Sequence, residues 1–491
     1  MESIWTRETK LKTSAPLQKD IAADVAVIGG GMAGLLSAYI LKKRGLHAVV
    51  LEARHAADGQ TKHTTAKITS QHNLIYSRLI RQRGEDCARQ YARANEEAIE
   101  VYRSIIQDLG IACSFEQKDA YLYSTMEETA LREEWEAARQ LGLDASLTRE
   151  TGLPFDVQAA LCFHGQAQFS PLAFLAGILP ELEVYEQTPV TAVEDGRVIT
   201  PGGVVRAKDI VMATHYPICN RPGYYFMRMH QERSYVLALE QAADVNGMYL
   251  SVDAEGFSFR NYKQYLLFGG GSHRTGENSA GGQYERLREA ARQYYPACSE
   301  AAAWSAQDCM TLDGVPYIGQ FSQSTPHLYV ATGFQKWGMT TSMVAARLLC
   351  SLITGQSAAY AEVYDPGRFV FTASAKSMMD EGLHAVSGLS KSIAGPGRAA
   401  LDALPLSHGG IVEAEGRKVG VYKDEQGNTY VIDPKCPHLG CQLEWNPDEK
   451  SWDCPCHGSR FDYRGRLLDN PAQTDLTGCH AEHAQGEEAV K

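Results

Sequence analysis

The sequence of 491 residues has no long uninterrupted hydrophobic run, no excess of positive charge and no secretory signal at its start. Its most apolar long stretch, residues 25–41, is interrupted by four glycines, which argues against a membrane span. The formal net charge of -12 argues against nucleic acid or an anionic membrane as a partner. Because the first residues lack the basic, apolar and cleavage regions of a signal peptide, we expect a cytoplasmic protein.

Paired cysteine spacings are also missing from most of the chain. Seven of the twelve cysteines are scattered, and we expect most of them to be buried thiols. The other five lie in the last 56 residues, a local density that is typical of a metal site. The chain is too long for one compact core, so we predict an enzyme-sized body followed by a small, chemically different unit.

A glycine-rich turn follows the apolar run DVAVI near the start of the chain. Its G-x-G-x-x-G pattern comprises Gly29, Gly31 and Gly34. The first glycine makes the turn, the second lets a pyrophosphate approach the backbone, and the third lets helix and strand pack closely. A second apolar run, HAVVL, ends in Glu52, where a ribose-binding carboxylate belongs. These features predict a dinucleotide site; the alternative is an ordinary glycine-rich turn with a solvated Glu52.

Later segments extend this pattern. Residues 207–213 are typical of a late strand of the nucleotide fold, and residues 313–319 read DGVPYIG. A strand is expected at residues 328–331, and the loop at 332–340 opens a helix that runs to Leu352. A second helix N-terminus therefore points at the same ligand.

In this order the segments resemble the D-amino-acid oxidase, glycine oxidase and sarcosine oxidase superfamily over roughly residues 20–365. The resemblance implies an α/β Rossmann-like domain that binds FAD rather than NAD, and an antiparallel-sheet (α+β) substrate domain. It implies that the three glycines and Glu52 hold the ADP half, that a middle strand at residues 188–193 passes the adenine at Val190, and that the loop before the last helix contacts the flavin. The residues concerned in that loop are Gly333, Gly338 and Met339.

Residues 59–69, GQTKHTTAKIT, lie where this family places a flavin-contacting loop. We expect contacts with the cofactor from Thr61, Thr65 and Lys67. For Lys62 and His63, a solvated loop position is at least as good an explanation as a cofactor contact. Cys309 lies near the position at which some relatives attach the flavin covalently. The spacing here is shorter, so we expect a buried thiol.

The resemblance also divides the body of the chain. Two insertions supply the substrate domain, and within them the candidates for substrate contact are Tyr235, Arg260, Tyr262 and His273, although residues in such positions are more often structural. Relatives that act on small N-methyl amino acids carry a basic residue just after the last glycine of this loop, where this sequence reads Gly338-Met339-Thr340, and this departure weakens the case for a carboxylate-bearing substrate. The nucleotide segments are expected at about residues 20–80, 160–225 and 309–365, and the insertions at about 81–159 and 226–308.

Two short arms near the C-terminus each combine cysteine with histidine. One arm, CPHLGC, begins at Cys436, and the other, CPCHGS, begins at Cys454. Two thiolates on one iron and two imidazoles on the other distinguish a Rieske [2Fe-2S] cluster from an all-cysteine cluster. We therefore assign Cys436 and Cys454 to one iron and His438 and His457 to the other. A tetrahedral zinc site is the chemical alternative.

Over residues 408–475 these arms resemble the Rieske proteins of the cytochrome bc1 and b6f complexes. The resemblance implies a small all-β domain, a disulfide between Cys441 and Cys456, and an exposed histidine edge through which electrons pass. Those proteins direct a serine and a tyrosine hydroxyl at the cluster. Ser459 keeps the first and Phe461 replaces the second, so we expect a lower potential than in the respiratory relatives.

We predict an oxidoreductase domain at residues 1–372, a linker at 373–407 with a short helix at 376–389, and a Rieske domain at 408–491. The predicted function is a FAD-dependent dehydrogenase that oxidises an amine or amino-acid derivative and passes electrons through the cluster to an external acceptor, such as a protein. One alternative is an electron-transfer or redox-sensing protein without its own substrate. Another is reverse flow, from cluster to flavin.

Overall fold

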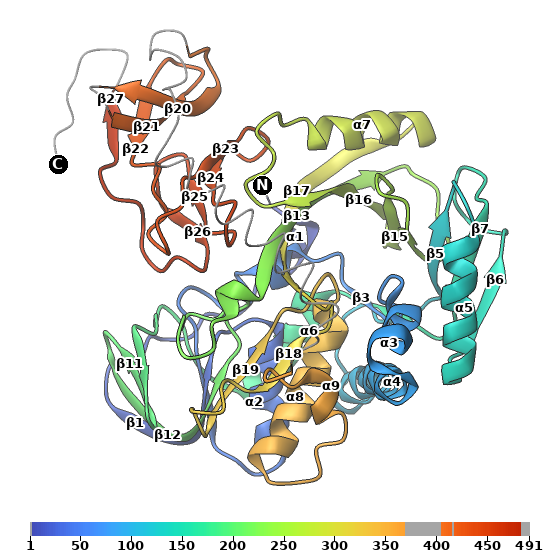
Figure 1. Ribbon diagram of the computed structural model, residues 1–491, viewed down its shortest axis with the longest axis horizontal. Coiled ribbons are helices and arrows are strands. Elements are labelled where there is room, and N and C mark those ends of the chain that lie inside the picture. The colour runs from blue at the N-terminus through green and yellow to red at the C-terminus, as the bar shows by residue number, and fades with distance from the viewer. Residues whose placement is uncertain (1, 369–403, 415–416, 483–491) are drawn as a thin grey trace.

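The computed structural model describes residues 2–368, 404–414 and 417–482 (Figure 1). A large body is built around two sheets, and the small C-terminal domain lies beside strands β13 (Met229–Glu240) and β17 (Ser299–Thr311) of that body. The predicted linker and its helix at 376–389 lie outside the described residues, except for the last four linker positions.

The first sheet of the body is the predicted α/β Rossmann-like layer. Its central strands pair in parallel, and residues 25–28 of β1 are all buried, as expected for a strand covered on both faces. Helices α2 (Met32–Lys43) and α8 (Gly338–Ile353) pack against each other. The strands pair in the order β10 (Ala192–Glu194), β11 (Arg197–Thr200), β12 (Gly203–Met212), β1 (Ile21–Ile28), β2 (Ala48–Leu51) and β9 (Glu183–Tyr185), with β19 (Leu328–Thr332) on β12 and β18 (Tyr317–Gln320) on β19.

One predicted strand of this layer is wrong. Residues 188–191 are irregular, and β10 begins only at Ala192. Pro189 has no N–H group to offer a neighbouring strand, and the hydroxyl of Thr188 bonds back to the Glu186 carbonyl over 2.8 Å. The segment is therefore a loop at the end of the sheet.

The second sheet has eight strands and forms the predicted substrate domain. Its pairs are antiparallel apart from β14 with β5. Helix α7 (Gln283–Tyr294) packs on β16 and β13. The strands pair in the order β17 (Ser299–Thr311), β13 (Met229–Glu240), β16 (Tyr265–Arg274), β15 (Ser258–Tyr262), β14 (Met248–Ser251), β5 (Ala120–Ser124), β7 (Ala159–Phe163) and β6 (Ala145–Thr148).

Two expected insertion boundaries are corrected by this arrangement. Helix α4 (Glu85–Leu109) packs on α8 and α3 (Ile75–Arg83), so it belongs with the nucleotide layer although we expected an insertion from residue 81. Strand β7 joins the second sheet although residues from 160 onward were expected in the nucleotide segment.

Shorter elements connect the two sheets. A three-stranded sheet of β3 (Lys67–Ile68), β8 (Ala167–Gln168) and β4 (Glu116–Gln117) anchors the end of the 59–69 loop. The part of the chain that the structure describes contains no helix with both the length and the apolar character needed to cross a membrane. The remaining elements are α1 (Ile4–Glu8), η1 (Gln60–His63), α5 (Thr129–Leu141), α6 (Pro171–Ile178), η2 (Leu179–Glu181), η3 (Tyr225–Met227) and α9 (Ala361–Tyr364).

The C-terminal domain is all-β, as predicted. Two four-stranded antiparallel sheets enclose a core that includes Trp452 and Phe461, both 0% exposed. One sheet contains β20 (His408–Ala414), β21 (Arg417–Lys423), β22 (Thr429–Ile432) and β27 (His480–Glu482), and the other β23 (Glu444–Asn446), β24 (Ser451–Asp453), β25 (Arg460–Asp462) and β26 (Leu467–Asp469).

Candidate flavin cavity and iron–sulfur site

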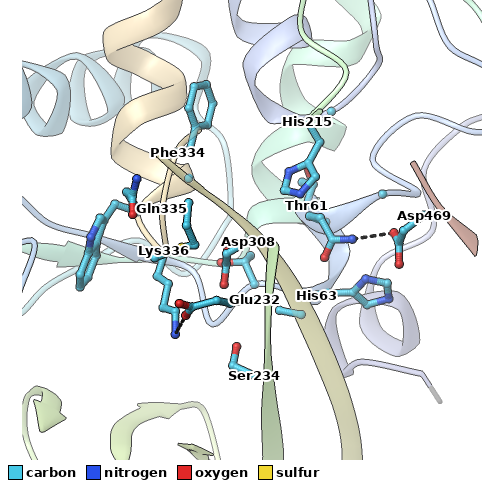
Figure 2. Close-up of a pocket in the computed structure, with 18 of the residues that line it drawn as sticks. Thr61, His63, His215, Glu232, Ser234, Asp308, Phe334, Gln335, Lys336 and Asp469 are labelled. Atoms are coloured by element: carbon cyan, nitrogen blue, oxygen red, sulfur yellow. Dashed lines mark hydrogen bonds and ion pairs between the residues drawn. The ribbon is translucent and has the colours of Figure 1, made fainter. Parts of the chain in front are cut away.

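A cavity of about 1140 Å³ extends from the glycine-rich turn to the second sheet (Figure 2). Gly29, Gly31 and Glu52 line one end, and charged residues of β13 and β17 line the other. Its length and its two different ends fit a dinucleotide cofactor with room for a second molecule.

The three glycines of the turn have the separate roles that their spacing predicts. Gly29 has a φ of +107°, and a Cβ there would lie 2.5 Å from the Ala213 carbonyl oxygen. A Cβ on Gly34 would lie 1.9 Å from the Gly29 oxygen, so this glycine serves helix–strand packing and does not line the cavity. Gly31 has only the Thr61 hydroxyl within reach, at 3.4 Å, and it leaves the cavity wall open to a ligand.

The wall beside the turn carries the predicted acid. The carboxylate of Glu52 accepts hydrogen bonds from the N–H of Gly30 at 2.6 Å and of Arg54 at 2.8 Å. Burial raises its pKa, and the backbone bonds oppose that rise. Val190, in the irregular segment, also lines this end.

The 59–69 loop supplies the predicted side chains to the cavity. Thr61, Thr65 and Lys67 all line it, and the Thr61 hydroxyl accepts a hydrogen bond from the first amide of α2 at 3.0 Å. Burial, followed by repulsion from Arg260, lowers the pKa of Lys67 to about 7. His63 lines the cavity as well, and burial lowers its pKa to about 4. Lys62 instead pairs with Asp58.

The loop before α8 contributes less than we expected. Gly338 and Met339 line the cavity, but Gly333 does not. Gly333 has a φ of +69°, and a Cβ there would lie 2.3 Å from the Thr311 side chain, so a tight turn explains this glycine.

Of the four candidates for substrate contact, the structure places Tyr235 in the cavity wall and the other three elsewhere. The Tyr235 hydroxyl is 3.0 Å from Nε2 of His273. Arg260 donates to the backbone oxygens of Thr65 and Ala66, each at 2.6 Å, and so positions the 59–69 loop. The Tyr262 hydroxyl donates to Glu8 at 2.8 Å.

Sequence reasoning missed the charged residues at the far end of the cavity. Glu232 on β13 and Asp308 on β17 face each other across the strand pair, and Lys336 lies 3.0 Å from Glu232 (Figure 2). Residues 230–234 of β13 are all polar, so the sequence has no alternation there that would show which side chains face the cavity. The contact with β17 depends on a strand register that no local motif reports.

Cys309 is buried beside this end and does not line the cavity. Its thiol lies 3.6 Å from the His215 carbonyl and 3.6 Å from Oε1 of Gln231. Burial raises its pKa far above the ordinary value, in agreement with the expected inert thiol.

In the C-terminal domain the four predicted ligands converge. The thiols of Cys436 and Cys454 are hydrogen-bonded to each other, and the rings of His438 and His457 have centroids 5.0 Å apart. Nδ1 of His438 is buried and has no hydrogen-bond partner among the described residues, as expected of a nitrogen that holds a metal. The set therefore fits a cluster with two sulfur and two nitrogen ligands.

The predicted surroundings of the cluster are also present. Cys441 and Cys456 form a disulfide with their Cα atoms 6.6 Å apart. The Ser459 hydroxyl bonds to the Cys436 sulfur and accepts a hydrogen bond from Ala472 N at 3.0 Å. Phe461 lies in the domain core and offers no hydroxyl to the cluster.

The histidine edge differs from our expectation of an exposed port. Nε2 of His438 is 2.9 Å from Oδ1 of Asn220, and the ring of Phe226 contacts both imidazoles, with centroids 6.4 and 5.9 Å away. His457 is only 7% exposed. The docked oxidoreductase body therefore covers His457 and contacts His438, which stays partly exposed.

A buried ionic network holds the domains together. Glu449 of the C-terminal domain accepts from Arg233 of β13 at 2.5 Å and from Arg460 at 2.7 Å. Burial alone would raise the pKa of Glu449, but the two guanidinium groups outweigh it and hold this pKa far below its usual value. Removal of Glu449 would leave Arg233 buried without an ion-pair partner among the described residues, whereas Arg460 would keep Asp453 and Asp469.

The C-terminal domain also completes the cavity. Residues 467–470 and 472–474 line it, and Gln60 donates to Asp469 over 2.8 Å. Figure 2 shows Asp469 near His63, on the side of the cavity away from Lys336.

Comparisons with known proteins agree with both sites. The model of the FAD dependent oxidoreductase family (DAO) matches residues 24–352, and that of the Rieske [2Fe-2S] domain matches residues 402–480. The chain belongs to the FAD-dependent oxidoreductase family and carries a C-terminal Rieske domain. The first domain accordingly binds FAD and the second a [2Fe-2S] cluster, which removes zinc from consideration.

Individual relatives cover the whole chain or one domain. A protein of Bacillus subtilis (strain 168), named as a Rieske 2Fe-2S iron-sulfur protein, YhfW, is 36% identical over 488 residues, 96% of each chain. The chloroplastic cytochrome b6-f iron-sulfur subunit of Oryza sativa is 41% identical over 66 residues, 13% of this chain and 29% of that protein. The glycine oxidase of Geobacillus kaustophilus shares the fold, with a TM-score of 0.60 at 18% identity, over 71% of this chain and 99% of its own.

Proposed function

We propose that this enzyme oxidises a small amine or amino-acid derivative in the cavity and passes the electrons to the cluster and on to an external acceptor. The observation that carries this proposal is the shared wall, because residues of the Rieske domain line the cavity that fits FAD. When bound, FAD accepts a hydride and the cluster accepts single electrons, so the two groups suit a substrate that gives two electrons and an acceptor that takes one.

Residues of the body link the cavity wall to a cluster ligand. His215 lines the cavity, and its Nε2 is 3.2 Å from Oε1 of Gln231. The amide of Gln231 donates to the backbone carbonyl of His457 at 2.8 Å. These two hydrogen bonds connect the cavity wall to the loop that carries a cluster ligand, and they support electron transfer from flavin to cluster within the chain. Such transfer favours a dehydrogenase over an oxidase.

The alternative of a redox protein without its own substrate receives less support. A cavity that only holds a cofactor does not need the charged side chains of Glu232, Asp308 and Lys336 at its far end, where they suit a polar or charged second molecule. Reverse flow, from cluster to flavin, uses the same connection and is distinguished by experiment.

The test is anaerobic mixing of the protein, loaded with FAD and cluster, with primary, secondary and N-methyl amines. Flavin absorbance and the electron paramagnetic resonance signal of the reduced cluster are followed together. We expect an amine to bleach the flavin before the cluster signal rises. If dithionite produces both signals and no amine produces either, amine oxidation is contradicted. If an added reduced carrier protein reduces the cluster first, the flow is reversed.

A further inference from the structure

The far end of the cavity contains an acidic group whose charge is not balanced locally. Glu232 and Asp308 lie opposite each other on β13 and β17, and both line the cavity (Figure 2). The cavity continues from there to Gly338 and Met339. A molecule at this end would therefore lie beside the segment that the family places against the flavin ring.

The two carboxylates are in different electrostatic situations. Glu232 pairs with Lys336 at 3.0 Å and with His230 at 3.5 Å, and these partners outweigh burial and lower its pKa to about 2. Asp308 makes no hydrogen bond or ion pair with its carboxylate among the described residues. Burial raises its pKa to about 7, an effect that Lys336 opposes and Glu232 reinforces.

Other charged groups around Asp308 are already engaged. Lys336 also donates to the Ser272 hydroxyl at 2.7 Å. Arg233, the other cation whose charge acts on Asp308, is held by Glu449 at the domain interface. On its own strand the next residue is the buried thiol of Cys309. A positively charged group of a ligand could therefore pair with the Asp308 carboxylate.

We propose that Asp308 binds the ammonium group of a cationic amine substrate and takes its proton. This inference rests on the proposed function and specifies the substrate class. The ammonium N–H bond breaks, the proton passes to a carboxylate oxygen of Asp308, and the electron pair stays on nitrogen. The neutral amine is then the form that gives up a hydride from the adjacent carbon, with two electrons, to the FAD that the domain binds, and leaves as an iminium ion.

Binding of unreactive probes tests the proposal without turnover. Benzyltrimethylammonium, a permanent cation, benzyl alcohol and benzoate are titrated into the holoenzyme, and dissociation constants are read from the perturbed flavin spectrum. We expect the cation to bind most tightly, and Asp308→Asn to weaken it by about tenfold, as the loss of one charged contact would. Asp195→Asn, the same change at an exposed turn, is the matched control and should leave the affinity unchanged.

Each other outcome overturns the inference. These outcomes are tighter binding of benzoate, no spectral change with the cation, or an affinity in Asp308→Asn within about twofold of the wild type. Failure of the proposed function has a different outcome. If the enzyme binds the cation through Asp308 but no amine reduces its flavin, the binding site stands and amine oxidation is contradicted. If amines reduce the flavin of the Asp308→Asn variant as fast as that of the wild type, the proposed function stands and the role of Asp308 is contradicted.

Discussion

The side-chain amide of Gln231 donates a hydrogen bond to the backbone carbonyl of His457 over 2.8 Å, and its own oxygen lies 3.2 Å from Nε2 of His215. One side chain of the oxidoreductase body thus contacts both a cluster-binding loop and the wall of the flavin cavity. Gln307 reinforces the contact by donating to Gly458 O at 2.8 Å.

Replacement of Gln231 by alanine should slow electron exchange between the two cofactors several-fold. The cluster loop loses a buried hydrogen bond to the body, whereas none of the four ligands changes. The measurement is the rise of the reduced-cluster signal after rapid flavin reduction. Cluster content and spectrum, determined in the same sample, should match the wild type; an unchanged rate would show that Gln231 is not on the route.

Glu449→Gln should destabilise the docked domain by about 3 kcal/mol, because Arg233 would remain buried without a carboxylate partner among the described residues, whereas Arg460 keeps Asp453 and Asp469. Urea unfolding followed by cluster absorbance measures this change. Glu285→Gln, which removes an exposed partner of Arg292, is the control and should leave the midpoint of the urea transition unchanged.

The same carboxylate predicts a pH dependence. The pKa of Glu449 is lower in the folded protein than in the unfolded chain, so its stabilising contribution is complete above the ordinary glutamate range. It is lost progressively as the pH falls below about 4. Docking measured by small-angle scattering should therefore persist at neutral pH and weaken only in acid; weakening between pH 6 and 8 would contradict the assignment.

Asp308 predicts a second pH dependence, of the amine reaction and in a higher pH range. Its pKa is raised to about 7, so the carboxylate accepts a proton only above that pH. The rate of anaerobic flavin reduction by an amine should rise as the pH increases through about 7, and Asp308→Asn should remove this limb. A profile that is the same in both proteins would assign the limb to another group.

Phe461→Tyr should raise the midpoint potential of the cluster. A hydroxyl at this position could donate to the reduced, more negative cluster, and a hydrogen bond of about 1.4 kcal/mol corresponds to about 60 mV for one electron. Redox titration of the resonance signal measures the shift. Ser459→Ala, which removes the existing hydroxyl, should move the potential in the other direction.

Gly31→Val should give a folded protein that has lost FAD but keeps its cluster. The backbone at Gly31 is extended, with φ −80°, so valine is tolerated there, and the new side chain occupies the cavity wall. The flavin-to-cluster absorbance ratio of the purified protein checks this result. Retention of FAD in full would contradict the position of the pyrophosphate.

The features that the sequence predicts well are those whose chemistry is local. The glycine turn, the acid at Glu52 and the two Cys–His arms each combine spacing and residue type within a short segment, and the structure brings each set together. Arg260 was misjudged because both faces of β15 are buried, so alternation does not show which face meets the cavity. Asp308 and Glu232 are distant in sequence, and only strand register joins them.

The docking of the two domains likewise could not be predicted from local sequence motifs. Arg233 and Glu449 are 216 residues apart, and neither has a neighbour that marks it as an interface residue. The burial of His457 follows from that docking, so the exposed histidine edge expected from the Rieske resemblance is kept only in part, at His438.

The participation of residues 467–470 and 472–474 in the cavity wall has a consequence for how the protein matures. A wall that belongs to another domain closes only after that domain has folded around its metal. FAD should therefore enter while the domains are apart and be retained once they meet. Loss of iron would then loosen the flavin, and an iron-starved cell would accumulate protein deficient in both groups.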